Sequence, residues 1–177
     1  PIGKDPDITE WKSFLHRLKH PKRTLKIGLI GKYIELKDSY ISIHESLIHA
    51  GAVSESALDI NWIHSELLND DNVAEKLSEL DGILVAPGFG ERGIEGKIAA
   101  VKYARENKVP FLGICLGMQC AVIEYARNVV GLKGAHTTEI NDKTEYPVIF
   151  LMEDQKEVTD KGGTMRLGAY ECAIEQG

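Results

Sequence analysis

Apolar and polar positions follow two alternating rhythms along the chain. From residue 26 onward, short runs rich in Ile, Leu and Val are separated by longer segments in which apolar residues recur every three or four positions. The short runs predict β-strands and the longer segments predict amphipathic helices. The predicted strands are 25–33, 58–65, 81–88 and 109–117, and the predicted helices are 38–51, 71–80, 93–107 and 118–131.

This order of elements indicates how the strands are arranged. Strands separated by helices are typical of βαβ units, in which neighbouring strands run parallel. Continuous apolar runs such as 82–86 fit strands that are covered on both faces. We therefore expect an α/β fold with a doubly wound, mainly parallel sheet flanked by helices.

The rhythm breaks after residue 134. Residues 146–154 and 165–176 have the composition of strands, and the polar segment 156–164 separates them without a helical pattern. Two strands joined in this way favour a hairpin. We expect an antiparallel extension near the C-terminus.

The first 25 residues are polar apart from one short amphipathic pattern. Ile8, Trp11, Leu15 and Leu18 recur at helical spacing, and Pro21 follows soon after. This pattern predicts a linker helix within residues 1–25, followed by one domain over 26–177. The missing initiator methionine hints at a fragment or a processed product.

Composition narrows the class of protein. The 177 residues are 43% hydrophobic and carry a net charge of −6, which suits one globular domain and gives no basic surface for nucleic acid. No apolar stretch is long enough to span a bilayer, and no signal-peptide pattern is present, so we expect a cytoplasmic protein without a membrane partner. Three cysteines without a CxxC pair favour neither disulfides nor a metal site.

The strongest local motif is GICLG at 113–117, which lies between a predicted strand and a predicted helix. It is the cysteine form of a nucleophile elbow, in which a sharp turn exposes the nucleophile. The start of a helix favours the thiolate of Cys115, and the N–H of Leu116 is free to stabilise an oxyanion. The alternative is that Cys115 is a small buried residue at a strand end.

A glycine-rich loop at 88–96 follows the predicted strand 81–88. Gly88, Gly90 and Gly93 match GxGxxG, but a dinucleotide fingerprint follows the first strand and needs an acidic residue about 20 positions on, where this chain has none. Backbone N–H groups that serve the chemistry of Cys115 are the better interpretation.

Other polar residues are less informative. An exposed Glu139 is ordinarily only solvated, and none of the six histidines carries the signature of a general base. His136 is the candidate nearest along the chain. No spacing of ligands supports a metal.

GICLGMQ resembles the nucleophile motif of the class I (triad) glutamine amidotransferases. The stretches 27–51, 88–129 and 162–170 are similar to the glutaminase domain of the CTP synthase family, and TEW at 9–11 is similar to its linker. The resemblance covers nearly the whole chain.

This resemblance implies hydrolysis of L-glutamine through a thioester on Cys115, which supplies ammonia for the ATP-dependent amination of UTP to CTP. It implies an oxyanion hole at Gly88 and Leu116 and a GTP-activation loop at Arg92 and Gly93, with Arg166 a weaker assignment. The implied glutamine pocket consists of Gly88, Phe89, Leu116, Gly117, Met118, Gln119 and Glu139.

The same resemblance implies partners and cofactors outside this domain. A synthetase domain of the parent chain would hold ATP, UTP and Mg²⁺, whereas this domain would need no cofactor. GTP would act as an allosteric activator. The parent would be a homotetramer, and the fragment a monomer or weak dimer.

Two departures from the family matter. The family has two glycines after a proline in the oxyanion loop, whereas this chain reads APGFG, and Gly88 remains where the N–H is needed. The family's His-Pro-Glu base and its arginine-rich segment do not occur before Gly177, so we expect this fragment to have little activity. The alternatives are a non-catalytic or regulatory domain of this fold, or a PfpI-like cysteine-elbow protein.

Overall fold

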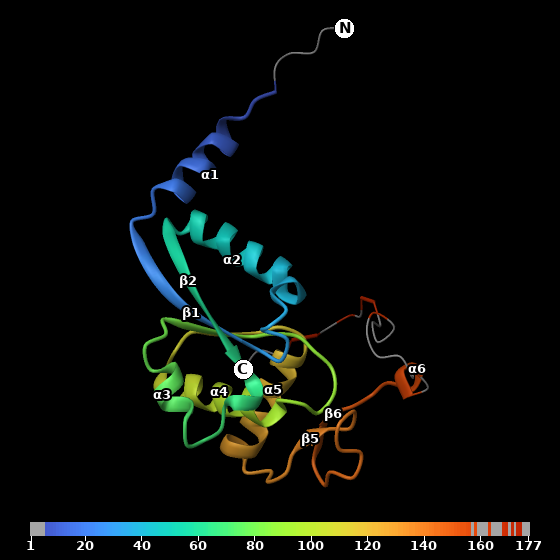
Figure 1. The fold of residues 1–177 in the computed structure, drawn as a ribbon. Coiled ribbons are helices and arrows are strands. Elements are labelled where there is room, and N and C mark those ends of the chain that lie inside the picture. The colour runs from blue at the N-terminus through green and yellow to red at the C-terminus, as the bar shows by residue number, and fades with distance from the viewer. Residues whose placement is uncertain are drawn as a thin grey trace, which may run out of the picture.

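The central sheet has four parallel strands. In this computed structural model, which describes residues 6–156, 158, 163, 168–169, 171 and 173–174, the strands stand in the order β2-β1-β3-β4. Their bounds are Arg23–Gly31 for β1, Ser56–His64 for β2, Gly82–Val85 for β3 and Phe111–Gly113 for β4. The predicted doubly wound, parallel sheet is confirmed (Figure 1).

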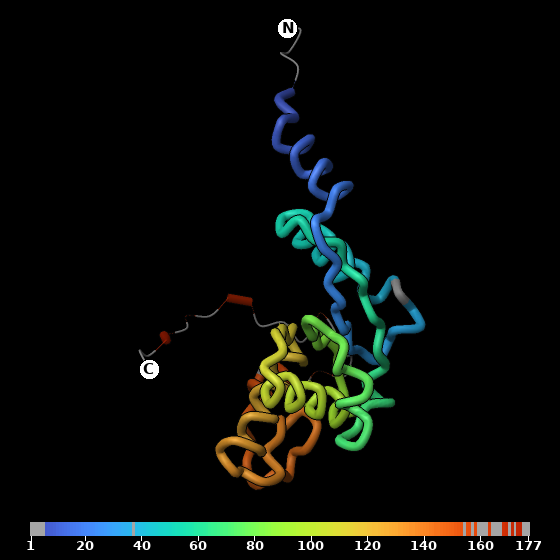
Figure 2. The backbone as a smooth tube through the Cα atoms, turned by 90° about the vertical axis from the view of Figure 1, so that its left-hand side faces the viewer, coloured from blue at the N-terminus to red at the C-terminus, as the bar shows by residue number. Residues whose placement is uncertain are grey.

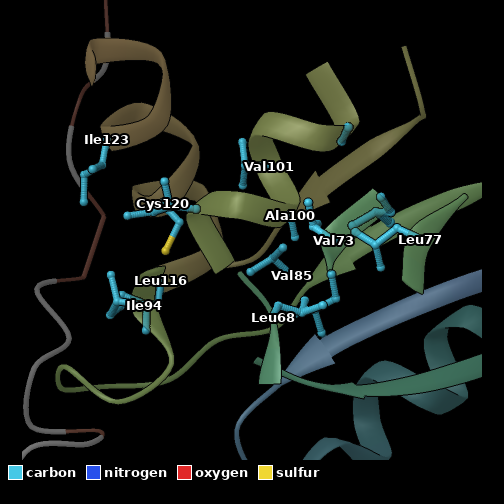
Figure 3. Close-up of a cluster of buried hydrophobic side chains, with 14 residues drawn as sticks. Leu68, Val73, Leu77, Val85, Ile94, Ala100, Val101, Leu116, Cys120 and Ile123 are labelled. Carbon is cyan, nitrogen blue, oxygen red and sulfur yellow. The ribbon is translucent and has the colours of Figure 1, made fainter. Parts of the chain in front are cut away.

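Both faces of this sheet are covered because apolar residues point to both sides. Successive side chains of a strand face opposite ways, and the neighbours Leu29 and Ile30 of β1 accordingly belong to different clusters, each fully buried. In β3, Leu84 packs with Leu29, whereas Ile83 and Val85 pack with Ile30. Figure 3 shows the larger cluster, including Val85, Leu116 and Cys120.

Helices form the outer two layers. Helix α2 (Ile41–Val53) follows the 3-10 turn η1 (Lys37–Tyr40) and packs on the Leu29 face. Helices α3 (Val73–Leu77), α4 (Ile94–Asn107) and α5 (Leu116–Tyr125) cover the Ile30 face. The 3-10 turn η2 (Ser65–Leu67) precedes α3, and the π-helical segment η3 (Ala126–Val130) extends α5.

Helix α1 (Thr9–Lys19) lies where the linker helix is predicted. It extends away from the body of the molecule (Figure 2). Its contact with the rest runs through α2, where the ring of Phe14 meets that of His49 edge-on at 5.5 Å, while Trp11 is 57% exposed. The domain boundary after residue 25 stays a prediction.

The C-terminal part contains a second, two-stranded sheet. Residues 147–149 form strand β6 (Pro147–Ile149), which pairs in parallel with β5 (His136–Thr137). A short helix α6 (Glu153–Lys156) follows. The second expected strand, 165–176, falls almost entirely outside the described residues. The predicted antiparallel pairing of 146–154 with 165–176 therefore stays a prediction.

The parallel sheet brings three loops to one edge. The carboxyl ends of neighbouring parallel strands lie together, and ligands bind there in open α/β sheets. Lys32 follows β1, residues 86–89 follow β3, and Ile114 and Cys115 follow β4. The predicted nucleophile and the predicted oxyanion loop thus lie on adjacent strands.

Candidate active site

Cys115 lies at the turn between β4 and α5 in a conformation that L residues rarely adopt. Its φ is 53° and its ψ is −107°, and it caps the N-terminus of α5. The side chain is exposed. Strained backbone of this kind costs on the order of 1–3 kcal/mol and persists where the surroundings impose it, which is typical of functional sites. The geometry is that of a nucleophile elbow.

Two glycines make this turn possible by removing β-carbons at close backbone contacts. A β-carbon at Gly113 would lie 2.5 Å from the carbonyl carbon of Gly117. A β-carbon at Gly117 would lie 2.2 Å from the carbonyl oxygen of Val85. The spacing G-x-C-x-G therefore reflects the crossing of β3, β4 and α5.

The start of α5 presents an unused donor beside Cys115. The N–H of Gly117 donates to Ile114 O (2.9 Å) and that of Gln119 to Cys115 O (3.1 Å). Across the described part of the chain, no acceptor is found for the N–H of Leu116. Such a donor at a helix N-terminus favours negative charge, either a thiolate or an oxyanion.

The loop after β3 lies next to this donor. A β-carbon at Gly88 would be 3.6 Å from Cδ2 of Leu116, so the two residues predicted to form the oxyanion hole are neighbours. Neither Gly88 N–H nor Phe89 N–H meets an acceptor within residues 6–156. The structure brings the loop and the elbow together with free N–H groups in both.

Two lysines that the sequence did not single out hold the loop from behind. Nζ of Lys97, on the first turns of α4, donates to Ala86 O (3.0 Å), and Nζ of Lys32 donates to Phe89 O. Lys97 is fully buried and Lys32 is 8% exposed. The signal for Lys97 was a charged residue inside the apolar stripe that runs from Ile94 to Val101.

Burial changes the acid–base behaviour behind the elbow. It lowers the pKa of Lys97, and the neighbouring sulfur atoms of Cys120 and Cys115 oppose that shift. Burial raises the pKa of Cys120 to about 11, so this thiol is protonated at neutral pH. Cys120 lies among Ile94, Leu116 and Ile123 (Figure 3).

Four residues of the predicted glutamine pocket, Leu116, Gly117, Met118 and Gln119, form the start of α5. Met118 is 50% exposed, whereas Leu116 and Gly117 are buried. Oε1 of Gln119 is buried and finds no donor in the part of the chain that the structure describes. A buried acceptor in that state favours a ligand that carries N–H groups.

Glu139 follows β5, which packs against α5. Its N–H donates to Oγ1 of the buried Thr137 (3.2 Å), which fixes the loop. His136 is buried, its Nδ1 accepts from the N–H of Thr137 (2.9 Å), and burial lowers its pKa. The structure thus ties Glu139 to the α5 side of the molecule and encloses His136.

The predicted GTP loop is ordered by charged and aromatic contacts. Nε of Arg92 pairs with Oε1 of Glu66 (3.0 Å), and the guanidinium lies 5.8 Å from the centroid of the Tyr33 ring. Gly93 has a φ of 76° and is the N-cap residue of α4. Arg166 lies outside the described residues.

Metal binding and membrane insertion each need features that can be sought among the described residues. No three His, Cys, Asp or Glu side chains among them are grouped to hold a metal ion. Over the same residues, every helix is too short or too polar to cross a membrane.

The fold and elbow define a class of protein, and comparison with known families agrees. A model of the class-I glutamine amidotransferase family matches residues 35–177. The chain belongs to this family, which confirms the resemblance seen in GICLGMQ.

The relatives are CTP synthases. The chain is 61% identical over 175 residues to the CTP synthase of Flavobacterium johnsoniae and 56% identical over 180 residues to that of Methanocaldococcus jannaschii. These alignments cover 99% and 98% of this chain but only 33% of each relative, so the chain spans about a third of their length.

A solved structure agrees with the fold. The glutaminase domain of Trypanosoma brucei CTPS with bound acivicin superimposes with a TM-score of 0.70 and 38% identity. The match covers 75% of this chain and 52% of that one. The part of the CTP synthases that this chain resembles is thus their glutaminase domain.

Proposed function

We propose that this chain is the glutamine-hydrolysing part of a CTP synthase. The thiolate of Cys115 attacks the side-chain amide carbon of L-glutamine, and the carbonyl oxygen takes up the negative charge. The C–N bond then breaks, the nitrogen leaves with a proton as ammonia, and a γ-glutamyl thioester remains on Cys115. Water attacks the thioester, breaks the C–S bond and releases glutamate.

The residues of the site have separate tasks in this reaction. The N–H groups of Gly88 and Leu116 stabilise the oxyanion, each donor contributing about a hundred-fold in rate. Oε1 of Gln119 and the carboxylate of Glu139 receive the amino group of the substrate. Phe89, Gly117 and Met118 line the rest of the pocket.

The observation that carries this proposal is the backbone of Cys115. A φ of 53° in a cysteine at the start of α5 is costly for a residue that only fills space. Beside it, the N–H of Leu116 has no acceptor among the residues that the structure describes. The exposure of the side chain also argues against the interpretation of Cys115 as a buried core residue.

Labelling by a chloroketone analogue of L-glutamine tests the pocket. The thiolate displaces chloride and forms an S–C bond, so the mass increase on Cys115 is located by peptide mapping. We expect the L analogue to react at least about ten-fold faster than its D form, because the amino group must meet Gln119 and Glu139. Equal rates would favour a non-catalytic domain of this fold.

Turnover depends on a general base. The sequence of 177 residues holds no His-Pro-Glu motif, and the histidine closest along the chain, His136, is enclosed and hydrogen-bonded to Thr137. We therefore propose that a polypeptide of residues 1–177 reacts at Cys115 but turns over slowly. Glutamate release near the rate of known glutaminases, abolished in Cys115→Ala, would contradict this. A PfpI-like protein is disfavoured because Leu116, not histidine, follows the cysteine.

The remaining steps concern the parts of the relatives that the match does not cover. There, ATP with Mg²⁺ would activate UTP, and ammonia from this site would complete CTP. GTP would act through the loop of Arg92 and Gly93. The same proposal includes a cytoplasmic parent protein that forms a homotetramer. A native mass measurement of the whole protein tests the number of subunits.

A further inference from the structure

Two ammonium groups meet the same short loop behind the elbow. Lys97 on α4 and Lys32 after β1 donate to the carbonyl oxygens of Ala86 and Phe89, at the two ends of the loop. We propose that Lys97 and Lys32 are positioning residues that hold this loop so that the N–H of Gly88 faces Cys115. The reaction they would serve is the proposed glutamine hydrolysis, so this inference rests on that function.

The contacts bracket the peptide groups that matter. Between the two held carbonyls lie the peptide groups that carry the N–H of Gly88 and of Phe89, both without an acceptor within residues 6–156. Glycine would otherwise let these peptide groups rotate at little cost. Ala86 is also fixed on its other side, because its N–H donates to Ile30 O (2.9 Å).

The anchors themselves are rigid. Lys32 follows directly on β1, its N–H donates to Tyr40 Oη (3.3 Å), and its ammonium lies 5.0 Å from the centroid of the Tyr33 ring. The backbone N–H of Lys97 donates to Gly93 O (3.2 Å), which places its stem on the first turn of α4. Because both anchoring lysines are themselves held in place, the loop is preorganised. Preorganised oxyanion donors need no reorganisation during the reaction.

The charge of Lys97 is hard to explain by stability alone. Its side chain is fully buried, and no carboxylate pairs with it among the residues that the structure describes. It also lies near the N-terminus of α4, where the helix dipole disfavours a cation. An unpaired buried ammonium is costly, so a methionine of similar size would suit folding better.

The titratable groups near the Lys97 ammonium show which negative charges it can stabilise. They are Cys115 at the elbow, Cys120 on α5 and the second ammonium of Lys32. Cys120 stays protonated, because burial raises its pKa to about 11. The negative charge that Lys97 serves under this proposal is therefore that of the oxyanion, through the loop that Lys97 holds.

The test compares Lys97→Met with Lys102→Met, a partly exposed lysine of the same helix. Cys115 is labelled with the chloroketone analogue of L-glutamine and, separately, with iodoacetamide, which needs no oxyanion loop. We expect Lys97→Met to slow the chloroketone about ten-fold and iodoacetamide no more than about two-fold. Amide hydrogen exchange of residues 86–90 should rise, while Lys102→Met changes none of these.

Each outcome decides the proposal. A folded Lys97→Met variant with unchanged exchange and an unchanged ratio of the two rates overturns it. Alkylation of the buried Cys120 shows whether the variant is unfolded; if it is, the same measurements on Lys32→Met decide, with a smaller loss of about three-fold expected. If the chloroketone does not label Cys115 even in the unaltered chain, the proposed glutamine pocket is wrong. Hydrogen exchange of residues 86–90 then still tests whether the lysines hold the loop.

Discussion

The carbonyl oxygen of Val85 occupies the space beside Gly117 so closely that a β-carbon there would lie 2.2 Å away. Strand β3 and helix α5 thus meet backbone to backbone at this point. The contact sets the elbow against the oxyanion loop, since Val85 is the last residue of β3 and the loop begins at Ala86. The geometry of the site therefore depends on an absent side chain.

Gly117→Ala should destabilise the fold by about 2 kcal/mol or more, because backbone on both sides must shift. Chemical denaturation measures the loss, and labelling of Cys115 by the chloroketone should fall with it. The matched control is Gly88→Ala, where the nearest atoms to the new β-carbon lie at 3.6 Å. Gly88→Ala should keep the stability of the unaltered chain, and an equal loss in both variants would contradict the steric argument.

Cys115 and Cys120 should differ sharply in alkylation. Cys115 is exposed, whereas Cys120 is fully buried and burial raises its pKa to about 11. At about pH 8, where free thiols begin to ionise, iodoacetamide should modify Cys115 within minutes and leave Cys120 unmodified until the protein unfolds. Peptide mapping with and without urea measures this. Comparable rates at both cysteines in the folded protein would rule out the packing around Cys120.

Arg105→Met should destabilise the packing of α4 on α5. Arg105 Nε and Nη2 donate to the carboxylate of Glu124 at 2.8 to 3.1 Å, and Glu124 is 1% exposed. Removing the arginine leaves a buried carboxylate, which we expect to cost about 2 kcal/mol, reduced by water reaching the partly exposed arginine. Urea denaturation measures the loss.

The matched control for that prediction is Lys26→Met, which breaks the exposed pair between Lys26 and Glu79. It should leave the unfolding midpoint unchanged, because exposed ion pairs contribute little. Equal losses in the two variants would mean that the burial of Glu124 is not what makes the arginine necessary.

The pattern of apolar and polar residues predicts some elements of this structure and misses others. Strand β3 and the second half of β1 could be predicted because strands covered on both faces carry apolar residues at successive positions, as Leu29 and Ile30 do. The elbow could be predicted because G-x-C-x-G is a steric requirement of the turn at Cys115. Strand β5 could not, since His136 and Thr137 are too few to show a period.

The lysines were missed for a different physical reason. Patterns of apolar and polar residues assign a lysine to the surface, and Lys97 contradicts that rule inside the buried face of α4. Its contact with Ala86 O depends on the distance between α4 and β3, which no local pattern contains. A charged residue within an apolar stripe is nevertheless a signal worth attention, because buried charges concentrate at functional sites.

Lys97→Met should keep or raise stability at neutral pH, and its advantage should shrink as the pH rises. Burial holds the pKa of Lys97 below its ordinary value of 10.5, so the unfolded chain binds more protons than the folded chain between the lowered pKa and 10.5. The stability of the unaltered protein therefore rises with pH in that window, and the variant lacks this rise.

Cys120 acts in the opposite direction over part of the same window. Its pKa is raised from 9.0 to about 11, so its contribution to stability is lost as the pH rises through that range in both proteins. Lys97 itself lowers the pKa of Cys120, so the contribution of Cys120 differs between the two proteins above the range where free thiols ionise. The quantity to measure is thus the difference between the two proteins from urea denaturation below about pH 8, where Cys120 is protonated in both. If the unaltered chain is more stable than Lys97→Met at neutral pH, contacts in the folded state more than offset the cost of burying the ammonium. The argument that Lys97 is kept for the loop would then fail.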